Sequence, residues 1–175
     1  MNPILDAIKS RRSIRKFTQE MPKREELQTI IEAGLYAASG MGKQSPVIVA
    51  VTDRELRDRL SEMNREIGGW PEDFDPFYGA PAVLIVLADK NVPTCVYDGS
   101  LAMGNMMLAA HALGLGSVWI HRAKQEFESE GGRAILKAIG LEGDYEGVGH
   151  CCIGYIDGEA PEAKSRRDGR VFWAE

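Results

Sequence analysis

The sequence predicts an α+β or α/β fold in a single domain, residues 1–175. Helical segments whose apolar residues recur every three to four positions are interspersed with short, buried strand segments such as 47–51 and 83–87. A chain of 175 residues is long enough to bury one sizeable core, and no internal repeat, low-complexity tract or domain linker interrupts it.

The first predicted helix begins at the N-terminus. Asn2 is a favourable cap and Pro3 suits the first helical position. The apolar residues that share one face of this helix are Ile4, Leu5 and Ile8. The helix runs into Lys9–Ser13, where cations lie near the negative end of the helix dipole.

A second helix and a strand follow. The helix opens after Pro22 and is expected over about Lys23–Ala38, with Ser39–Gly42 as the loop that ends it. Its apolar stripe consists of Leu27, Ile30, Ile31 and Leu35. A buried strand is expected at Val47–Val51. Asp53 can then cap a third helix, whose spaced apolar residues are Leu56, Leu60, Met63 and Ile67.

The second half of the chain begins with an irregular stretch, Gly68–Gly79, and ends in a polar tail. Between them we expect strands at Val83–Leu87, Ser117–His121 and Val148–Ile156 and helices at Asp98–Leu113 and Ser129–Ile139. The helix that Asp98 caps is apolar on nearly every side. Since such a helix must be enclosed, a subunit interface is a natural place for it in a small chain.

Charge and cysteine content limit the function classes. The net charge of −5 argues against a general nucleic-acid or anionic-membrane binder. Nine of the 21 Lys and Arg residues nevertheless gather in two short segments, 9–16 and 164–170. Such gathering indicates a small bound anion, although two solvated basic turns would give the same pattern. The three cysteines form no disulfide framework, and the sequence shows neither a signal peptide nor a spanning segment, so we expect reduced, buried thiols in a cytoplasmic protein.

Common catalytic and cofactor motifs are absent from the sequence. The three histidines have no metal-ligand spacing, and there is no C-x-x-C, H-E-x-x-H or G-x-S-x-G. Neither a Rossmann glycine motif nor a P-loop is present. Side-chain cations would therefore have to hold an anionic cofactor, and we expect no metal site.

The segment Arg11–Phe17, read RRSIRKF, resembles the R-R-S-x-R-x-F opening of the FMN-binding nitroreductase family. Four further segments resemble that family in the same order. They are Ala37–Gln44 at the flavin loop, Gly79–Val86 at the A-P-strand, Asp98–Gly116 at the long helix ending in A-L-G-L-G, and Gly154–Arg166 at the final strand and tail. In the flavin loop, Gly42 replaces the family's Asn and Ser45-Pro46 replaces its Pro-Trp.

The resemblance implies an α+β fold, a sheet flanked by helices, with non-covalent FMN at the interface of a homodimer. Two or more guanidinium groups with a hydroxyl make a good phosphate cradle, which is the role implied for Arg11, Arg12 and Ser13, assisted by Lys164 and Arg166. Arg15 would lie near the pyrimidine edge. The remaining implied contacts are Ser39 and Gln44 from the flavin loop, and the backbone of Arg122 and Ala123 near N5.

The resemblance also implies the chemistry. NADH or NADPH would reduce the flavin, and a small planar acceptor such as a nitroaromatic or quinone would then be reduced in a ping-pong cycle. The flavin carries the reaction, so no protein nucleophile or essential general acid is expected. The alternatives are a same-fold flavoenzyme, for reductive dehalogenation or flavin fragmentation, and a non-catalytic flavin- or anion-binding module.

The irregular stretch Gly68–Gly79 has two open interpretations. It carries four aromatic residues, Trp70, Phe74, Phe77 and Tyr78. These aromatics either pack onto the core or form a mobile cover over the exposed flavin face.

Overall fold

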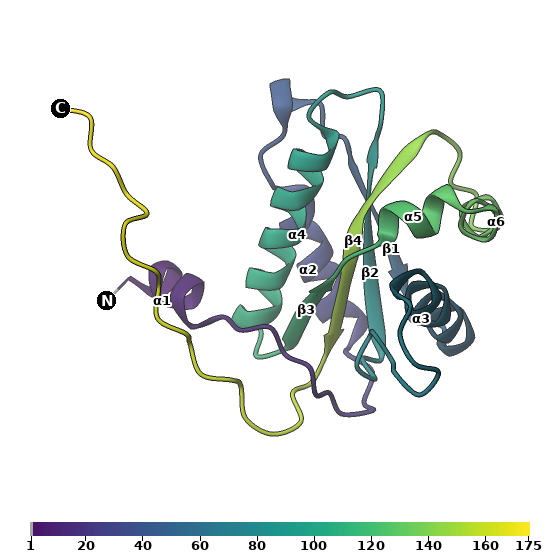
Figure 1. Ribbon diagram of the computed structural model, residues 1–175, viewed down its shortest axis with the longest axis horizontal. Coiled ribbons are helices and arrows are strands. Elements are labelled where there is room, and N and C mark those ends of the chain that lie inside the picture. Colours follow the sequence, from purple (N-terminus) through teal and green to yellow (C-terminus); the bar gives the residue numbers. More distant parts are fainter. Residues whose placement is uncertain (1) are drawn as a thin grey trace.

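The computed structural model describes residues 2–175 and contains a four-stranded antiparallel sheet in the order β1-β2-β4-β3 (Figure 1). The strands are β1 (Pro46–Val51), β2 (Ala82–Asp89), β3 (Gly116–Ile120) and β4 (Tyr145–Gly154). All four predicted strands are present, and the last one begins three residues earlier than expected and ends at Gly154.

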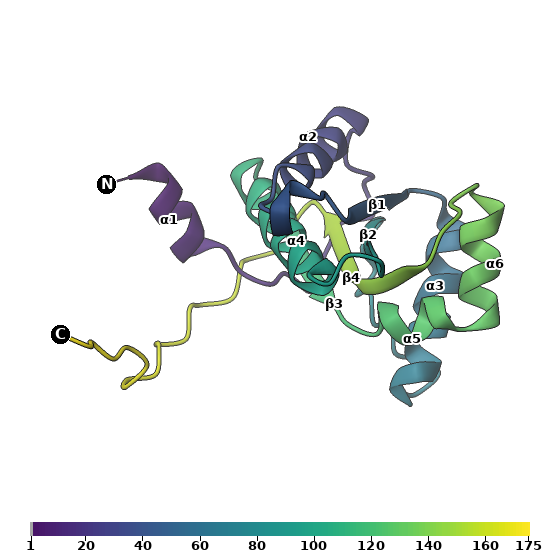
Figure 2. The ribbon, with the colours of Figure 1, turned by 90° about the horizontal axis from the view of Figure 1, so that it is seen from above.

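Helices cover both faces of this sheet, so the predicted α+β fold with a flanked sheet is confirmed. The helices are α1 (Pro3–Ser10), α2 (Arg24–Leu35), α3 (Arg54–Gly68), α4 (Cys95–Ala112), α5 (Ala123–Glu128) and α6 (Glu130–Ala138), with a short 3₁₀ turn, η1, at Gly40–Gly42. Helices α2 and α4 lie on one side of the sheet, and α3, α5 and α6 lie on the other (Figures 1 and 2).

Strand β2 shows why the sheet divides the core in two. Every residue from Ala82 to Ala88 is buried, because both faces of the sheet are covered. Val83, Ile85 and Leu87 enter the core under α3, α5 and α6, whereas Leu84 and Val86 enter the core under α2 and α4. This explains why the strand reads as a continuous apolar run rather than an alternating one.

Capping residues explain where several helices begin. Asn2 accepts hydrogen bonds from the backbone N–H groups of Ile4 and Leu5, and Asp53 accepts one from Leu56, as the sequence predicts. Asp98 does not cap α4, however, because that helix begins at Cys95 with Thr94 at its N-cap. The prediction for this cap was wrong, and Asp98 lies inside the first turn.

Two other boundaries differ from the sequence prediction. Helix α2 ends at Leu35 rather than near Ala38, since Ala37 bonds back to Gly34 in a tight turn. Helix α5 was not predicted at all. Its six residues are too few to show a helical period.

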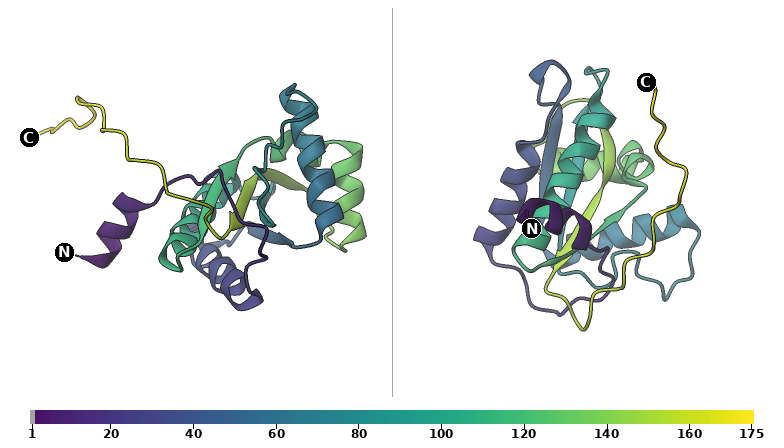
Figure 3. Two further views of the ribbon diagram at one scale, coloured as in Figure 1. Left: turned by 90° about the horizontal axis from the view of Figure 1, so that it is seen from below. Right: turned by 90° about the vertical axis from the view of Figure 1, so that its left-hand side faces the viewer.

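The two ends of the chain project from the body on the same side. Helix α1 has no buried residue, and the segment after β4 runs past α1 without regular secondary structure (Figure 3). Within residues 2–175, the apolar face of α1 is largely exposed, with Ile4 at 64% and Ile8 at 55%. Helix α4 contacts α1 but leaves these side chains mostly exposed among the described residues.

Candidate flavin site

The chain leaves α1 at Arg11 and runs beside strand β3. The Ile14 N–H donates to the Ser117 carbonyl at 3.0 Å, and Ser13 forms a bridge with Ser117. Ile14 and Phe17 are buried. Because successive residues of an extended segment point to opposite sides, Ser13 and Arg15 face away from the core.

A cavity of about 830 Å³ brings the two cationic segments together. It is lined by six of the residues predicted to hold the cofactor: Arg11, Arg12, Ser13, Arg15, Lys164 and Arg166. The segments are separated by about 150 residues in sequence, and they meet because the tail passes back over the end of α1 (Figure 3).

The two neighbouring arginines of this cavity differ in what their guanidinium groups bind. Arg12 Nη1 donates to the carbonyls of Lys9 at 2.7 Å and Arg11 at 2.6 Å, so it satisfies the end of α1. Arg11 Nη1 is buried and has no hydrogen-bond partner among the described residues. An unpaired buried donor is costly, so Arg11 retains a hydrogen-bonding capacity that Arg12 has already used.

The backbone of the turn after β3 is tightly constrained by its neighbours. Arg122 has a left-handed backbone (φ 79°), Asn64 Nδ2 donates to the His121 carbonyl at 2.8 Å, and Ala123 is buried. A side chain at Gly147 would lie 2.2 Å from the Ala123 carbonyl oxygen, so this glycine lets β4 approach the turn closely. The predicted residues Arg122 and Ala123 therefore occupy a rigid position at the end of β3.

Asp98 anchors the loop between α2 and β1. Its carboxylate accepts hydrogen bonds from Gly40 N–H at 3.0 Å, Ser45 Oγ at 2.8 Å and Thr94 Oγ1 at 3.1 Å. Burial acts to raise the pKa of Asp98, but these three donors outweigh it and lower the pKa below its usual value. Asp98 is thus a charged anchor for the loop.

Ser39 and Gln44 lie in this loop. The Gln44 N–H donates to Ser39 Oγ at 3.0 Å. The backbone is left-handed at Met41, Gly42 and Gln44. At Gly42 (φ 66°) both glycine and asparagine are the residues that tolerate this conformation best, so the departure from the family motif preserves the turn.

Within one chain the predicted residues fall into separate places. Ser39 and Gln44 line a hollow of about 650 Å³ that shares no residue with the cationic cavity. Figure 1 shows the turn at residues 40–42 at the top of the body, away from α1, which lies at the left. Within one chain, these residues therefore line two separate hollows.

The nitroreductase family model matches residues 8–68 and 70–155. The chain belongs to the nitroreductase family. A nitroreductase with bound FMN from Bacteroides fragilis has a TM-score of 0.89 and 28% identity, with 100% of both chains covered. The NADPH-flavin oxidoreductase of Vibrio harveyi is 32% identical over 98% of this chain and 72% of its own length. An iodotyrosine deiodinase from Thermotoga neapolitana is 29% identical over 67% of this chain and 73% of its own.

The structure contains a buried polar cluster that the sequence did not predict. Glu126 and His150 are fully buried, with Glu126 Oε2 3.0 Å from His150 Nε2, and Asn64 Nδ2 lies 3.3 Å from the same oxygen. The cluster lies directly behind the His121–Ala123 turn. These residues come from α3, α5 and β4, so no local pattern could have linked them.

The cysteines have the buried structural environment that the sequence suggests. Cys95, Cys151 and Cys152 are all buried and form no disulfide. Burial raises the pKa of Cys151 to about 12, which the nearby Arg11 offsets only in part. A thiol that stays protonated at neutral pH is unsuited to act as a nucleophile.

The irregular stretch Gly68–Gly79 resolves into two parts. Phe77 is fully buried and packs 5.0 Å from the His150 ring, as the core interpretation predicts. Trp70, Phe74 and Tyr78 are only half-buried and touch one another edge to face. Neither interpretation alone describes the segment.

The described residues contain no group of three or more His, Cys, Asp and Glu side chains placed to hold a metal ion. Over the same residues, the helices are all too short or too polar to cross a membrane. A cytoplasmic location stays a prediction.

Proposed function

We propose that this nitroreductase-family chain binds FMN and uses NADH or NADPH to reduce small, planar, electron-poor acceptors such as quinones and nitroaromatics. The observation that carries the proposal is Arg11, which lines a cationic cavity of an otherwise acidic protein and whose buried Nη1 has no hydrogen-bond partner among the described residues. Relatives in the same family bind FMN or act on flavin with NADPH.

The residues of the cavity fit a phosphate group. A phosphate supplies several acceptor oxygens, and guanidinium groups bind it through paired, charge-assisted hydrogen bonds. Arg11 and Ser13 would bind these oxygens from one side, and Lys164 and Arg166 from the tail. When bound, FMN supplies the two-electron chemistry at its N5 atom.

The other residues would orient the ring. Arg15 is exposed and has no ion-pair partner among the described residues, so it can place positive charge beside the pyrimidine edge. The rigid backbone of Arg122 and Ala123 would hydrogen-bond beside N5. NAD(P)H would give its hydride and leave before the acceptor enters from the same face.

A second copy of the chain would complete the site by supplying Ser39 and Gln44. A homodimer would account for exposed apolar residues at the two chain ends and on α4, namely Ile4, Leu5, Ile8, Tyr97, Leu101, Phe172 and Trp173. Burial between two copies would remove these residues from water, and the proposed assembly would bring the flavin loop of each chain to its partner's cavity.

Reductive dehalogenation is the second candidate, favoured by the similarity to an iodotyrosine deiodinase. Both reactions use the same cofactor, so the acceptor distinguishes them. An absorption spectrum of the purified protein, followed by anaerobic titration with NADH and NADPH, tests the proposal. We expect a yellow protein that the nicotinamide bleaches and a quinone recolours. A protein that binds no flavin, or whose flavin neither nicotinamide bleaches, would refute it.

A further inference from the structure

Three aromatic side chains between α3 and β2 form a continuous ladder with a cation at each end. Trp70 and Phe74 lie 5.0 Å apart between ring centroids, and Phe74 and Tyr78 lie 5.9 Å apart. The Arg122 guanidinium lies 4.3 Å from the centroid of Trp70, and the Arg15 guanidinium lies 5.7 Å from that of Tyr78. These three aromatic residues and the two arginines, Arg15 and Arg122, are together called the ladder below.

The segment that carries the ladder is rigid. Asp75 Oδ1 accepts hydrogen bonds from Ser61 Oγ and the Phe77 N–H, and Oδ2 accepts from Arg57 and the Gly79 N–H. Phe77 anchors the same segment in the core. The three half-buried aromatics are therefore held in place before any ligand arrives, which reduces the entropic cost of binding one.

Arg122 is placed to recognise an anion. Its guanidinium makes no ion pair within residues 2–175, and stacking on a ring leaves the N–H edge of a guanidinium free for a carboxylate. A non-glycine residue in the left-handed region is strained, and such strain points to a functional constraint. Glycine would relieve this strain, so the presence of arginine at this position points to its side chain.

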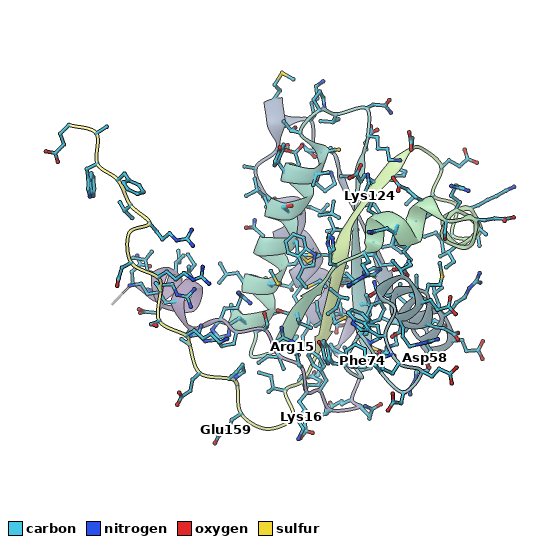
Figure 4. The ribbon with its side chains drawn as sticks, in the orientation of Figure 1. Arg15, Lys16, Asp58, Phe74, Lys124 and Glu159 are labelled. Carbon is cyan, nitrogen blue, oxygen red and sulfur yellow. The ribbon has the colours of Figure 1, made fainter. Side chains whose placement is uncertain are left out.

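The charges on the two sides of the ladder differ, which favours one orientation of a bound anionic ligand. A hollow of about 540 Å³ that Phe74 also lines carries the carboxylates of Asp58, Glu62, Glu72, Asp73 and Asp75 and the guanidinium groups of Arg57 and Arg65. The excess of carboxylates over guanidinium groups disfavours an anionic group on that side. Figure 4 shows Phe74 between Asp58 on one side and Arg15 on the other.

We propose that the ladder binds the ring of the electron acceptor and that Arg122 binds an acidic substituent on it. The preferred acceptors would then be planar aromatic acids, such as aromatic carboxylates bearing a nitro or quinone group. This inference rests on the proposed function, because Arg15 and the Arg122 turn are also the residues assigned to the two edges of the flavin ring.

Equilibrium binding of a matched pair of ligands tests the inference. Isothermal titration of the FMN-supplemented protein with 4-nitrobenzoate and 4-nitrobenzamide compares a charged and a neutral ligand of the same shape. We expect the carboxylate to bind roughly tenfold tighter, the effect of one charge-assisted hydrogen bond. Arg122→Gln should bring the two dissociation constants together, Arg122→Lys should keep part of the preference, and Trp70→Leu should weaken both ligands alike.

The control is Arg59→Gln, which removes an exposed cation of α3 outside the ladder and should leave the preference unchanged. Equal affinity for the two ligands in the wild type, or an unchanged preference in Arg122→Gln, would overturn the inference. These titrations measure equilibrium binding and do not depend on catalytic turnover. Failure of NADH to bleach the flavin would count against the proposed function, whereas the ligand preference decides the role of the ladder separately.

Discussion

At the scale of single residues, hydrogen-bonding state separates cations that look equivalent in the sequence. Arg11 and Arg12 are adjacent and both line the cationic cavity, but Arg12 is already engaged by two carbonyls of the α1 end. The Nη1 group of Arg11 is a buried donor that has no hydrogen-bond partner among the described residues. A bound anion therefore gains more from Arg11 than from its neighbour.

We predict that Arg11→Ala weakens FMN binding far more than Arg12→Ala does. The loss of a charge-assisted hydrogen bond, about 1.5–3 kcal/mol, corresponds to roughly a 10- to 150-fold rise in the dissociation constant. Quenching of FMN fluorescence on binding measures this constant for both variants. A larger effect in Arg12→Ala would contradict the assignment.

Asp98 gives a prediction that depends on pH. Asp98→Asn should lower the free energy of unfolding by about 1–3 kcal/mol, because the Gly40 N–H, Ser45 and Thr94 lose a charged acceptor. The folded pKa of Asp98 lies below its unfolded value of about 3.9, so the stabilisation is complete above that value and lost as pH falls through the folded pKa.

Urea unfolding of the wild type and Asp98→Asn between pH 7 and pH 2.5 measures this contribution. The difference between the two proteins should stay constant down to about pH 5 and shrink at lower pH. A difference that grows as the solution becomes more acidic would show that the carboxylate is not the stabilising form.

At the scale of elements, the segment between α3 and β2 combines a core anchor with a surface ladder. We predict that Phe77→Ala lowers the free energy of unfolding by about 3–5 kcal/mol, since its side chain is fully buried. Phe74→Ala should cost clearly less and should change acceptor preference instead. Thermal melting and kcat/KM for a quinone and a nitroaromatic check both variants, and equal losses of stability would contradict the division.

Helix α4 gives the prediction for assembly. Leu101 is 52% exposed on this helix, whereas Met107, an apolar residue of the same helix, packs partly against the core. Leu101→Asp should therefore produce monomers with weakened flavin binding and little loss of core packing. Light scattering tests the oligomeric state, with Ile139→Asp on the opposite side of the sheet as a control. A Leu101→Asp dimer that keeps its flavin would refute this interface.

At the scale of the whole molecule, the sequence predicted the fold through periodicity and the family through motifs that cover most of the chain. All four strands and five of the six α-helices were expected. The short helix α5 and the role of Asp98 were missed, because six residues show no period and a buried carboxylate in a first turn looks like a cap.

The candidate site was predictable where a sequence motif or a cluster of charged residues marks it. Arg11–Arg15 could be identified from their spacing, and their meeting with Lys164 and Arg166 from charge clustering and the family resemblance. The contacts of Arg122 with Trp70 and of Asn64 with the His121 carbonyl join α3 to the end of β3. Such contacts depend on tertiary packing between distant segments, and no local pattern encodes them.

If the proposed function is right, the two cationic segments form one FMN phosphate site. Gel filtration of the Arg11→Ala, Lys164→Ala double variant, with the flavin-to-protein absorbance ratio recorded across the peak, tests it most directly. We predict that the wild type elutes with bound FMN, whereas the folded double variant loses most of it, since each lost charged hydrogen bond costs about 1.5–3 kcal/mol. A folded double variant that keeps its full complement of FMN would contradict the claim.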